Sequence, residues 1–179
     1  LYNLFIYLSV RDASYLYYIF YIAAIGLYQA SSNGVAVQYL WPDNPGIANA
    51  APPFLIGATA LCGAQFVRSF LQTNSFSRGL DLALKLAMAG GLALILLTLS
   101  IGYATPLKLA PYVALPFLLL CLTAGVMACR RGLRVARYFL LAWSAFLVGS
   151  LIYTLMVMGY LPNTFITLYA GQIGAAMEV

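Results

Sequence analysis

Residues 80–103 read LDLALKLAMAGGLALILLTLSIGY, an apolar run whose only charged residues are Asp81 and Lys85 near its start. A helix needs about 20 such residues to cross about 30 Å of hydrocarbon, so this run is long enough to span a bilayer. The rest of the chain is similar: of 179 residues, 64% are hydrophobic and 7% are charged. Soluble domains are about 25% charged, so this composition excludes a soluble enzyme, a disordered tail and a secreted disulfide scaffold.

Apolar runs separated by turn signals predict an all-α bundle of seven membrane helices in one domain over residues 1–179. Because the chain begins and ends inside apolar runs, we expect a piece of a longer protein whose first helix, Leu1–Val10, and last helix, from Phe165, are both cut short. The five helices expected between them are Tyr15–Ser32, Pro53–Leu71, Leu80–Tyr103, Leu109–Cys129 with Pro116 inside it, and Val135–Leu161. The stretch Asn33–Pro53, rich in Pro, Gly and Asn, is predicted to be a long structured loop.

The basic residues predict how the bundle is oriented. The connections after the first, third and fifth helices hold all but one of the nine Lys and Arg residues: Arg11, Arg68, Arg78, Lys85, Arg130, Arg131, Arg134 and Arg137. The other connections hold only Lys108. Basic loops face the cytoplasm, so we expect the N-terminus outside and the C-terminus inside.

Aromatic residues are expected at both membrane interfaces, which amphipathic rings prefer. At the cytoplasmic interface we place Tyr15, Tyr17, Tyr18, Phe20, Tyr138, Phe139 and Trp143. At the outer interface we place Tyr39, Trp41, Tyr103, Tyr112 and Tyr160.

The sequence contains no histidine, no paired carboxylates, no nucleophile beside a base and no glycine-rich phosphate loop. We therefore expect no catalytic residues, no metal and no cofactor in this chain. The last run, Phe165–Val179, also lacks the lysine that a retinal protein of the opsin type needs there. Glu178 is interpreted either as an interfacial carboxylate or as a partner of a cytoplasmic arginine.

Uncharged polar residues inside the apolar runs have two interpretations, and both stay open. They form hydrogen bonds between helices, or they line a polar cavity for a small ligand. The residues concerned are Asn3, Gln29, Gln65, Ser144, Thr154 and Gln172. Small residues four apart permit close helix packing, either inside the bundle or in a dimer; the pairs are Ala87/Gly91, Ala145/Gly149 and Gly171/Ala175.

Five stretches of the chain resemble one family, the bacterial seven-transmembrane receptors with diverse intracellular signalling modules. They are Leu1-Tyr2-Asn3-Leu4-Phe5 with Ser9-Val10-Arg11-Asp12; Tyr15-Leu16-Tyr17-Tyr18; Asn33-Gly34 with Gln38-Tyr39-Leu40-Trp41-Pro42; Arg68-Ser69-Phe70-Leu71; and Phe139-Leu140-Leu141-Ala142-Trp143 with Gln172-Ile173-Gly174 and Glu178. The resemblance implies the bacterial inner membrane, an extracytoplasmic sensor domain upstream and a cytoplasmic output downstream. That output would be a histidine kinase of a two-component system or a diguanylate cyclase that makes cyclic di-GMP.

The sequence thus predicts a signal-transducing membrane domain whose partners are the bilayer, the flanking domains of its own chain and a second copy in a homodimer, with no nucleic acid. The expected moving parts are the Pro116 kink and the end of the last helix. The candidate relay positions are Tyr2, Asn3, Arg11, Asp12, Tyr15, Tyr18, Asn33, Gly34, Tyr39, Trp41, Pro42, Arg68, Pro116, Trp143, Gln172 and Glu178. The alternative functions are a small transporter, a lipid-binding membrane module or a structural subunit of a membrane complex.

Overall fold

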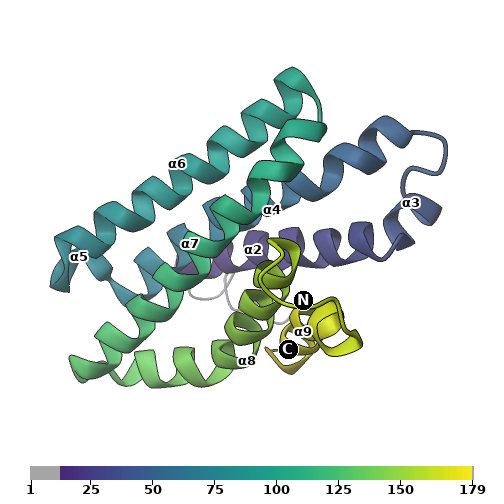
Figure 1. Cartoon of the computed structure of the whole chain (residues 1–179). Helices are drawn as coiled ribbons and strands as arrows, with labels where there is room; N and C mark the ends of the chain where they lie inside the picture. The colour runs from purple at the N-terminus through teal and green to yellow at the C-terminus, as the bar shows by residue number, and fades with distance from the viewer. Residues whose placement is uncertain (1–12, 179) are drawn as a thin grey trace.

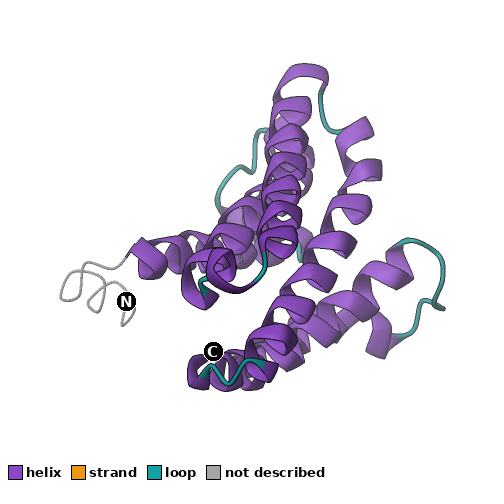
Figure 2. Cartoon of the chain, turned by 90° about the vertical axis from the view of Figure 1, so that its left-hand side faces the viewer, coloured by secondary structure: helices purple, strands orange, loops and turns teal. Residues whose placement is uncertain are grey.

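The computed structural model describes residues 13–178, apart from the side chains at 76, 134, 135, 142 and 175–178. Every regular element in this range is a helix, as Figures 1 and 2 show. The helices are α2 (Ala13–Ser32), α3 (Val35–Tyr39), α4 (Pro45–Leu71), α5 (Thr73–Phe76), α6 (Arg78–Ile101), α7 (Ala104–Arg130), α8 (Arg134–Val157) and α9 (Phe165–Glu178). The predicted first helix, together with Tyr2, Asn3, Arg11 and Asp12, lies outside the described residues.

Three of the described helices, α4, α6 and α7, are both long and apolar enough to cross a membrane. In α8 the apolar stretch is shorter, Trp143–Val157. The prediction of an all-helical membrane protein is therefore confirmed. The count of seven crossings and the orientation stay predictions.

The predicted loop over Asn33–Pro53 is wrong, because the chain forms the short helix α3 there and begins α4 at Pro45. Asn44 caps α4, since its side-chain oxygen accepts a hydrogen bond from the Ile47 N–H at 3.2 Å. Proline is favoured in the first turn of a helix, where its missing N–H has no intrahelical partner. The Pro52-Pro53 pair, which we interpreted as the helix start, lies inside α4 instead.

Two other observed helix boundaries also differ from the predicted ones. Helix α7 begins at Ala104, not Leu109, because Pro106 falls in its first turn, where proline is tolerated. Helix α8 ends at Val157, not Leu161, because Gly159 adopts a φ of 84° that ends the helix. The Tyr160 N–H then bonds the Leu155 carbonyl at 3.0 Å, as in a Schellman motif.

The helices pack mainly on their neighbours in the order α2, α4, α6, α7 and α8, with α4 also against α7 (Figure 1). Helix α9 packs back on α8 as a hairpin. This arrangement brings the C-terminal half of α2, the N-terminal halves of α4 and α7, and the C-terminal half of α8 around one cavity.

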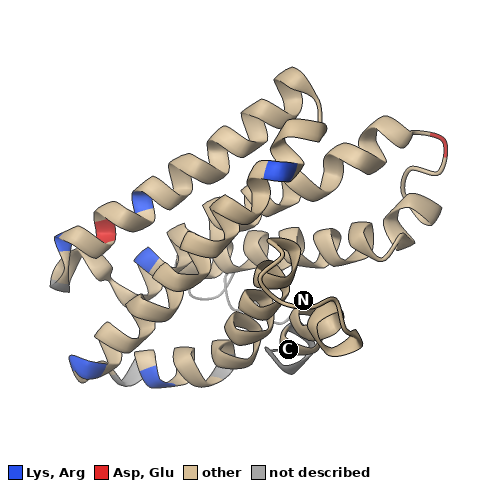
Figure 3. Cartoon of the chain, viewed as in Figure 1, with Lys and Arg blue, Asp and Glu red and all other residues tan. Residues whose placement is uncertain are grey.

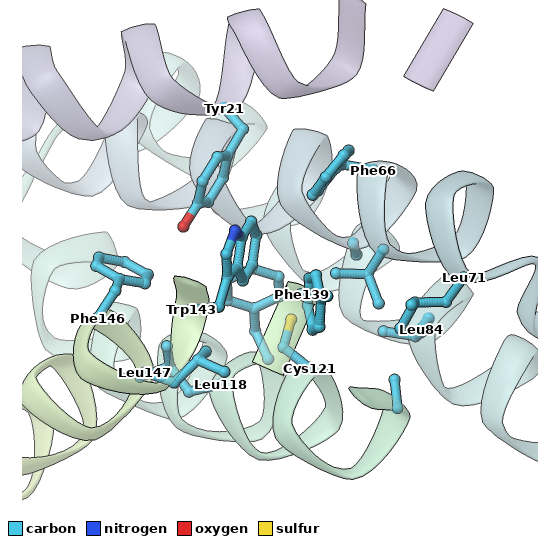
Figure 4. Close-up of a cluster of buried hydrophobic side chains, with 14 of the residues drawn as sticks. Tyr21, Phe66, Leu71, Leu84, Leu118, Cys121, Phe139, Trp143, Phe146 and Leu147 are labelled. Atoms are coloured by element: carbon cyan, nitrogen blue, oxygen red, sulfur yellow. The ribbon is translucent and has the colours of Figure 1, made fainter. Parts of the chain in front are cut away.

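An aromatic cluster joins α2, α4 and α8 in the core (Figure 4). The rings of Tyr21 and Trp143 stack with centroids 4.8 Å apart. The ring of Phe139 also contacts Trp143, with centroids 4.7 Å apart. Phe139 and Trp143 are each 3% exposed, so their rings pack inside the bundle and do not face outward, while their depth at the cytoplasmic interface stays a prediction. Tyr138, next to Phe139 in the chain, is 77% exposed and does face outward.

Glycines let the helix backbones approach closely at two crossings. A Cβ on Gly91 of α6 would lie 2.6 Å from the Gly57 carbonyl oxygen of α4. A Cβ on Gly149 of α8 would collide with the Ala170 carbonyl of α9, and one on Gly174 with the Ala145 carbonyl. These small residues therefore serve packing inside the bundle, one of the two uses that the sequence left open.

Candidate functional site: a neutral cavity and a buried ion pair

A cavity of about 650 Å³ lies between α2, α4, α7, α8 and α9. Its inner end is apolar, formed by Ile25, Ala60, Phe117, Leu118 and Phe146. The polar lining residues of α2 and α8 lie farther from this inner end, toward the turn after α2, which we call the outer end: Tyr28, Gln29, Ser32, Asn33, Ser150, Tyr153 and Thr154. The apolar residues Pro52, Leu107 and Val157 line the outer end as well, and Thr59 and Gln172 add polar groups from α4 and α9. None of its lining residues in the described part of the chain is Asp, Glu, Lys or Arg. The site thus suits an uncharged molecule.

One hydrogen bond ties α9 to the end of α2 at this cavity. The Gln172 side-chain Nε2 donates to the Asn33 Oδ1 at 2.7 Å, across 139 residues of sequence. Both residues belong to the family-like stretches, and Gln172 was a predicted interhelical donor. On the facing side, the Tyr28 hydroxyl of α2 lies beside that of Tyr153 in α8.

The other predicted interhelical hydrogen bonds divide between the two interpretations. Gln29 and Thr154 line the cavity. The hydroxyls of Thr154 and Ser144 donate to carbonyls of α8 itself, at Ser150 and Leu141, and not to other helices, so Thr154 fits the cavity interpretation and Ser144 fits neither. Serine and threonine commonly bond to the preceding turn of their own helix. Asn3 lies outside the described residues.

A buried ion pair joins α4 to α6 at the end of the bundle where basic residues gather (Figure 3). Arg68 Nε lies 2.8 Å from Asp81 Oδ1, and Thr73 of α5 donates its hydroxyl to the same oxygen at 3.1 Å. Lys85 Nζ lies 2.9 Å from Asp81 Oδ2. The Asp81 side chain is 5% exposed and that of Lys85 is 55% exposed, so Lys85 reaches toward the surface while Asp81 does not.

Gln65 completes this cluster from within α4, because its Oε1 accepts from Arg68 Nη1 at 2.7 Å. Sequence reasoning singled out Arg68 but placed Asp81 in or beside a loop, and so missed the pair. The signal that it left unused is the spacing of Asp81 and Lys85, four residues apart on a helix, which marks one helix face.

The structure brings the candidate relay positions together in two places and leaves others apart. Asn33 meets Gln172 at the cavity, and Tyr18 joins Trp143 through Phe66, with ring centroids 5.0 and 5.4 Å apart. The remaining positions lie elsewhere: Tyr15 half-buried on α2, Gly34 at the turn before α3, Tyr39 and Pro42 exposed around α3, Pro116 exposed on α7, and Glu178 at the end of α9.

Trp41 is a site residue of a different kind. It lines a second, smaller hollow that shares Ser32, Pro52 and Leu107 with the main cavity. Its Nε1 is buried, and no acceptor in residues 13–178 lies within hydrogen-bond distance of it. The residues of the smaller hollow thus include one with a buried indole N–H that lacks an acceptor in residues 13–178.

These features define an integral membrane domain in which apolar helices surround a mostly apolar cavity that contains several uncharged polar side chains. The family model described as 7TM diverse intracellular signalling matches residues 1–179, and the chain belongs to this family. Membership gives the chain a role in membrane signalling, and the predicted resemblance is confirmed. No curated protein and no solved structure matches the sequence.

Proposed function

We propose that the chain is the membrane relay of a bacterial receptor, a single seven-helix domain with its N-terminus outside and its C-terminus in the cytoplasm. It would couple an extracytoplasmic stimulus to an output module such as a histidine kinase or a diguanylate cyclase farther along the same chain, in a homodimer in the cytoplasmic membrane. Catalysis would belong to that module, because the membrane domain of this family is typically not catalytic.

The observation that carries this proposal is the position of α9. It lines the cavity through Leu168, Tyr169, Gly171 and Gln172, and in the proposed receptor it would connect the bundle to the output module. A change in the cavity therefore acts directly on the segment that would carry a signal out of the bundle.

The charge distribution supports the proposed orientation. Arg68, Arg78 and Lys85 lie around the α4–α6 connection, and Arg130, Arg131 and Arg137 around the α7–α8 connection, at one end of the bundle (Figure 3). Helix α9 is antiparallel to α8, so its C-terminus points toward this basic end. A basic end favours the cytoplasmic side.

Signalling requires two packings of the bundle that differ in free energy by a few kcal/mol, so that a stimulus shifts their populations. The α8–α9 contact is the best place for such a difference, because Gly149 and Gly174 bring the two backbones together there. A methyl group at Gly149 would collide with the Ala170 carbonyl, whereas one at Gly26 of α2 would have no heavy atom within 4 Å.

These two glycines provide the test, made in the full-length receptor. We expect Gly149→Ala to change the basal activity of the kinase or cyclase module several-fold while the protein still inserts into the membrane. Gly26→Ala, away from the cavity lining, is the matched control and should behave as wild type. If Gly149→Ala displaces α9, as shown by cysteine cross-linking between α8 and α9, and output stays unchanged, the relay function is wrong.

The alternative function, a small transporter or lipid-binding module, makes a different prediction about the parent gene. A receptor requires a sensor domain upstream and an output domain downstream of these residues. A stop codon soon after Val179 would favour the alternative, and solute flux in reconstituted vesicles would then be the measurement.

A further inference from the structure

We propose that the cavity between α2, α4, α7, α8 and α9 binds an uncharged amphiphile, a molecule with an apolar tail and a hydroxyl or carbonyl oxygen at one end. Only the effect of this ligand on output rests on the proposed function; its binding does not.

The volume of the cavity is suitable for such a ligand. At about 650 Å³ it falls within the range of about 300–1,000 Å³ that small-molecule sites occupy. Such sites are mostly apolar and contain a few polar groups that orient the ligand. This cavity has the same composition.

The lining excludes a charged ligand. A carboxylate or ammonium group in this cavity would lose its water without gaining an opposite charge, because none of the described lining residues is ionised at neutral pH. An unpaired charge in an apolar site is strongly disfavoured. Hydroxyl and amide side chains, by contrast, pair well with neutral oxygens.

The two ends of the cavity differ, and the difference orients the ligand. Phe117, Leu118 and Phe146 form the apolar inner end, which suits a hydrocarbon tail. At the outer end lie Ser32 and, in the adjoining hollow, Trp41 with its buried and unused Nε1 donor. A buried donor without an acceptor is unfavourable, and a ligand oxygen that reached the adjoining hollow would supply the acceptor.

The inner end also connects the ligand to the core. The Phe146 ring lies edge-on to Tyr21 and Trp143, with centroids 6.1 and 6.3 Å away (Figure 4). A tail that fills the inner end would press on the aromatic cluster that holds α2, α4 and α8 together. Binding at the cavity thereby reaches the helix on which α9 packs.

Photolabelling of the full-length protein in lipid nanodiscs tests the proposal. The probe is a ten-carbon alkanol with a diazirine near the chain end, and the matched probe is the carboxylic acid of equal length. We expect the alkanol to label the segments around Phe117 and Phe146 saturably, excess 1-decanol to compete, and the acid to label them at least fivefold less.

Two variants make the labelling specific. Ala114→Phe fills the cavity from α7 and should reduce labelling at least fivefold, whereas Ala89→Phe, on the exposed face of α6, should not. Trp41→Phe keeps an aromatic ring at this position but removes the indole N–H donor, and it should weaken alkanol binding several-fold. Labelling that spreads over the lipid-facing helices and is equal in the Ala114→Phe variant would overturn the proposal, as would equal labelling by the acid.

The source of the amphiphile is distinguished by mass spectrometry of organic extracts. A neutral lipid that co-purifies with the wild type and the Ala89→Phe variant, but not with Ala114→Phe, supports the site with the membrane as source. Saturable probe binding without such a lipid supports a ligand from outside. Saturable binding with no effect on output in any variant would retain the site and reject the relay. An output response to Gly149→Ala without saturable binding of the alkanol would retain the relay and reject the site.

Discussion

Gly57 of α4 and Gly91 of α6 face each other so closely that a methyl group on either one would lie within 2.7 Å of the other's carbonyl oxygen. The neighbouring Gly90 is different, because a Cβ there would meet only Val113, at 3.8 Å. Two adjacent glycines of one helix therefore have opposite tolerance for a side chain.

This difference gives a prediction for stability. Gly91→Ala should destabilise the bundle by about 1–3 kcal/mol, the usual cost of overpacking a closely packed site. Gly90→Ala should be neutral or slightly stabilising, because alanine is the better helix former. Thermal unfolding in detergent compares the two variants, and equal melting temperatures would contradict the close crossing of α4 and α6.

The ion pair of Arg68 and Asp81 gives a second prediction. Arg68→Leu leaves the carboxylate of Asp81 buried without its main partner, which should cost about 3–5 kcal/mol. Lys85→Leu should cost about 1 kcal/mol or less, because the Lys85 side chain is 55% exposed. Unfolding by denaturant in mixed micelles measures both. Adding Asp81→Asn to Arg68→Leu should recover part of the loss, and no recovery would show that Arg68 acts through packing alone.

The aromatic cluster gives a third prediction. Trp143→Ala removes a ring that is 3% exposed and stacks on Tyr21, so it should lower stability by about 3–5 kcal/mol. Tyr138→Ala, five residues earlier on α8 and 77% exposed, is the control and should change stability by less than about 0.5 kcal/mol. Comparable losses in the two variants would place Trp143 at the surface.

The hydrogen bond between Gln172 and Asn33 is tested by a double-mutant cycle with Gln172→Leu and Asn33→Leu. We expect a coupling free energy of about 0.6–2 kcal/mol, typical of hydrogen bonds between membrane helices. Thermal stability of the wild type, the two single variants and the double variant supplies the four values. Additive losses would mean that α9 is not held to α2 by this bond.

Pro116 provides the last prediction. It is an exposed residue in the middle of α7. Because proline has no backbone N–H, the helix lacks one backbone hydrogen bond at this position. Pro116→Ala should alter the output of the full-length receptor without abolishing membrane insertion. Leu119→Ala, also exposed on α7, is the control. Unchanged signalling in Pro116→Ala would remove Pro116 from the mechanism.

Hydropathy and turn signals predict most of the helices of this bundle, because a long apolar run is enough to identify a membrane helix. They misplace the start of α4, since Pro52-Pro53 has the same appearance at a helix start as inside a membrane helix. The Asn44-Pro45 pair was the better start signal, an N-cap followed by proline.

The site was less accessible to sequence reasoning. Polar residues such as Gln29 and Gln172 are visible in an apolar run, but their meeting around one cavity depends on how five helices are rotated about their axes. The burial of Asp81 was hidden for a similar reason, because its partner Arg68 lies on another helix. Trp143 was assigned to the interface because a tryptophan near a helix end has that preference on average.

Helix α9 packs almost wholly on α8 through the Gly149 and Gly174 contacts. Helix α8 also packs on α7 and, through Phe139, Trp143 and Phe146, on α2 and α4. A chimera that receives α8 and α9 from a relative should therefore fold if it keeps these three α8 residues, because the shared surface of α8 and α9 also stays intact. A chimera that receives α9 alone should fail, since its small residues would no longer match the ridges of α8.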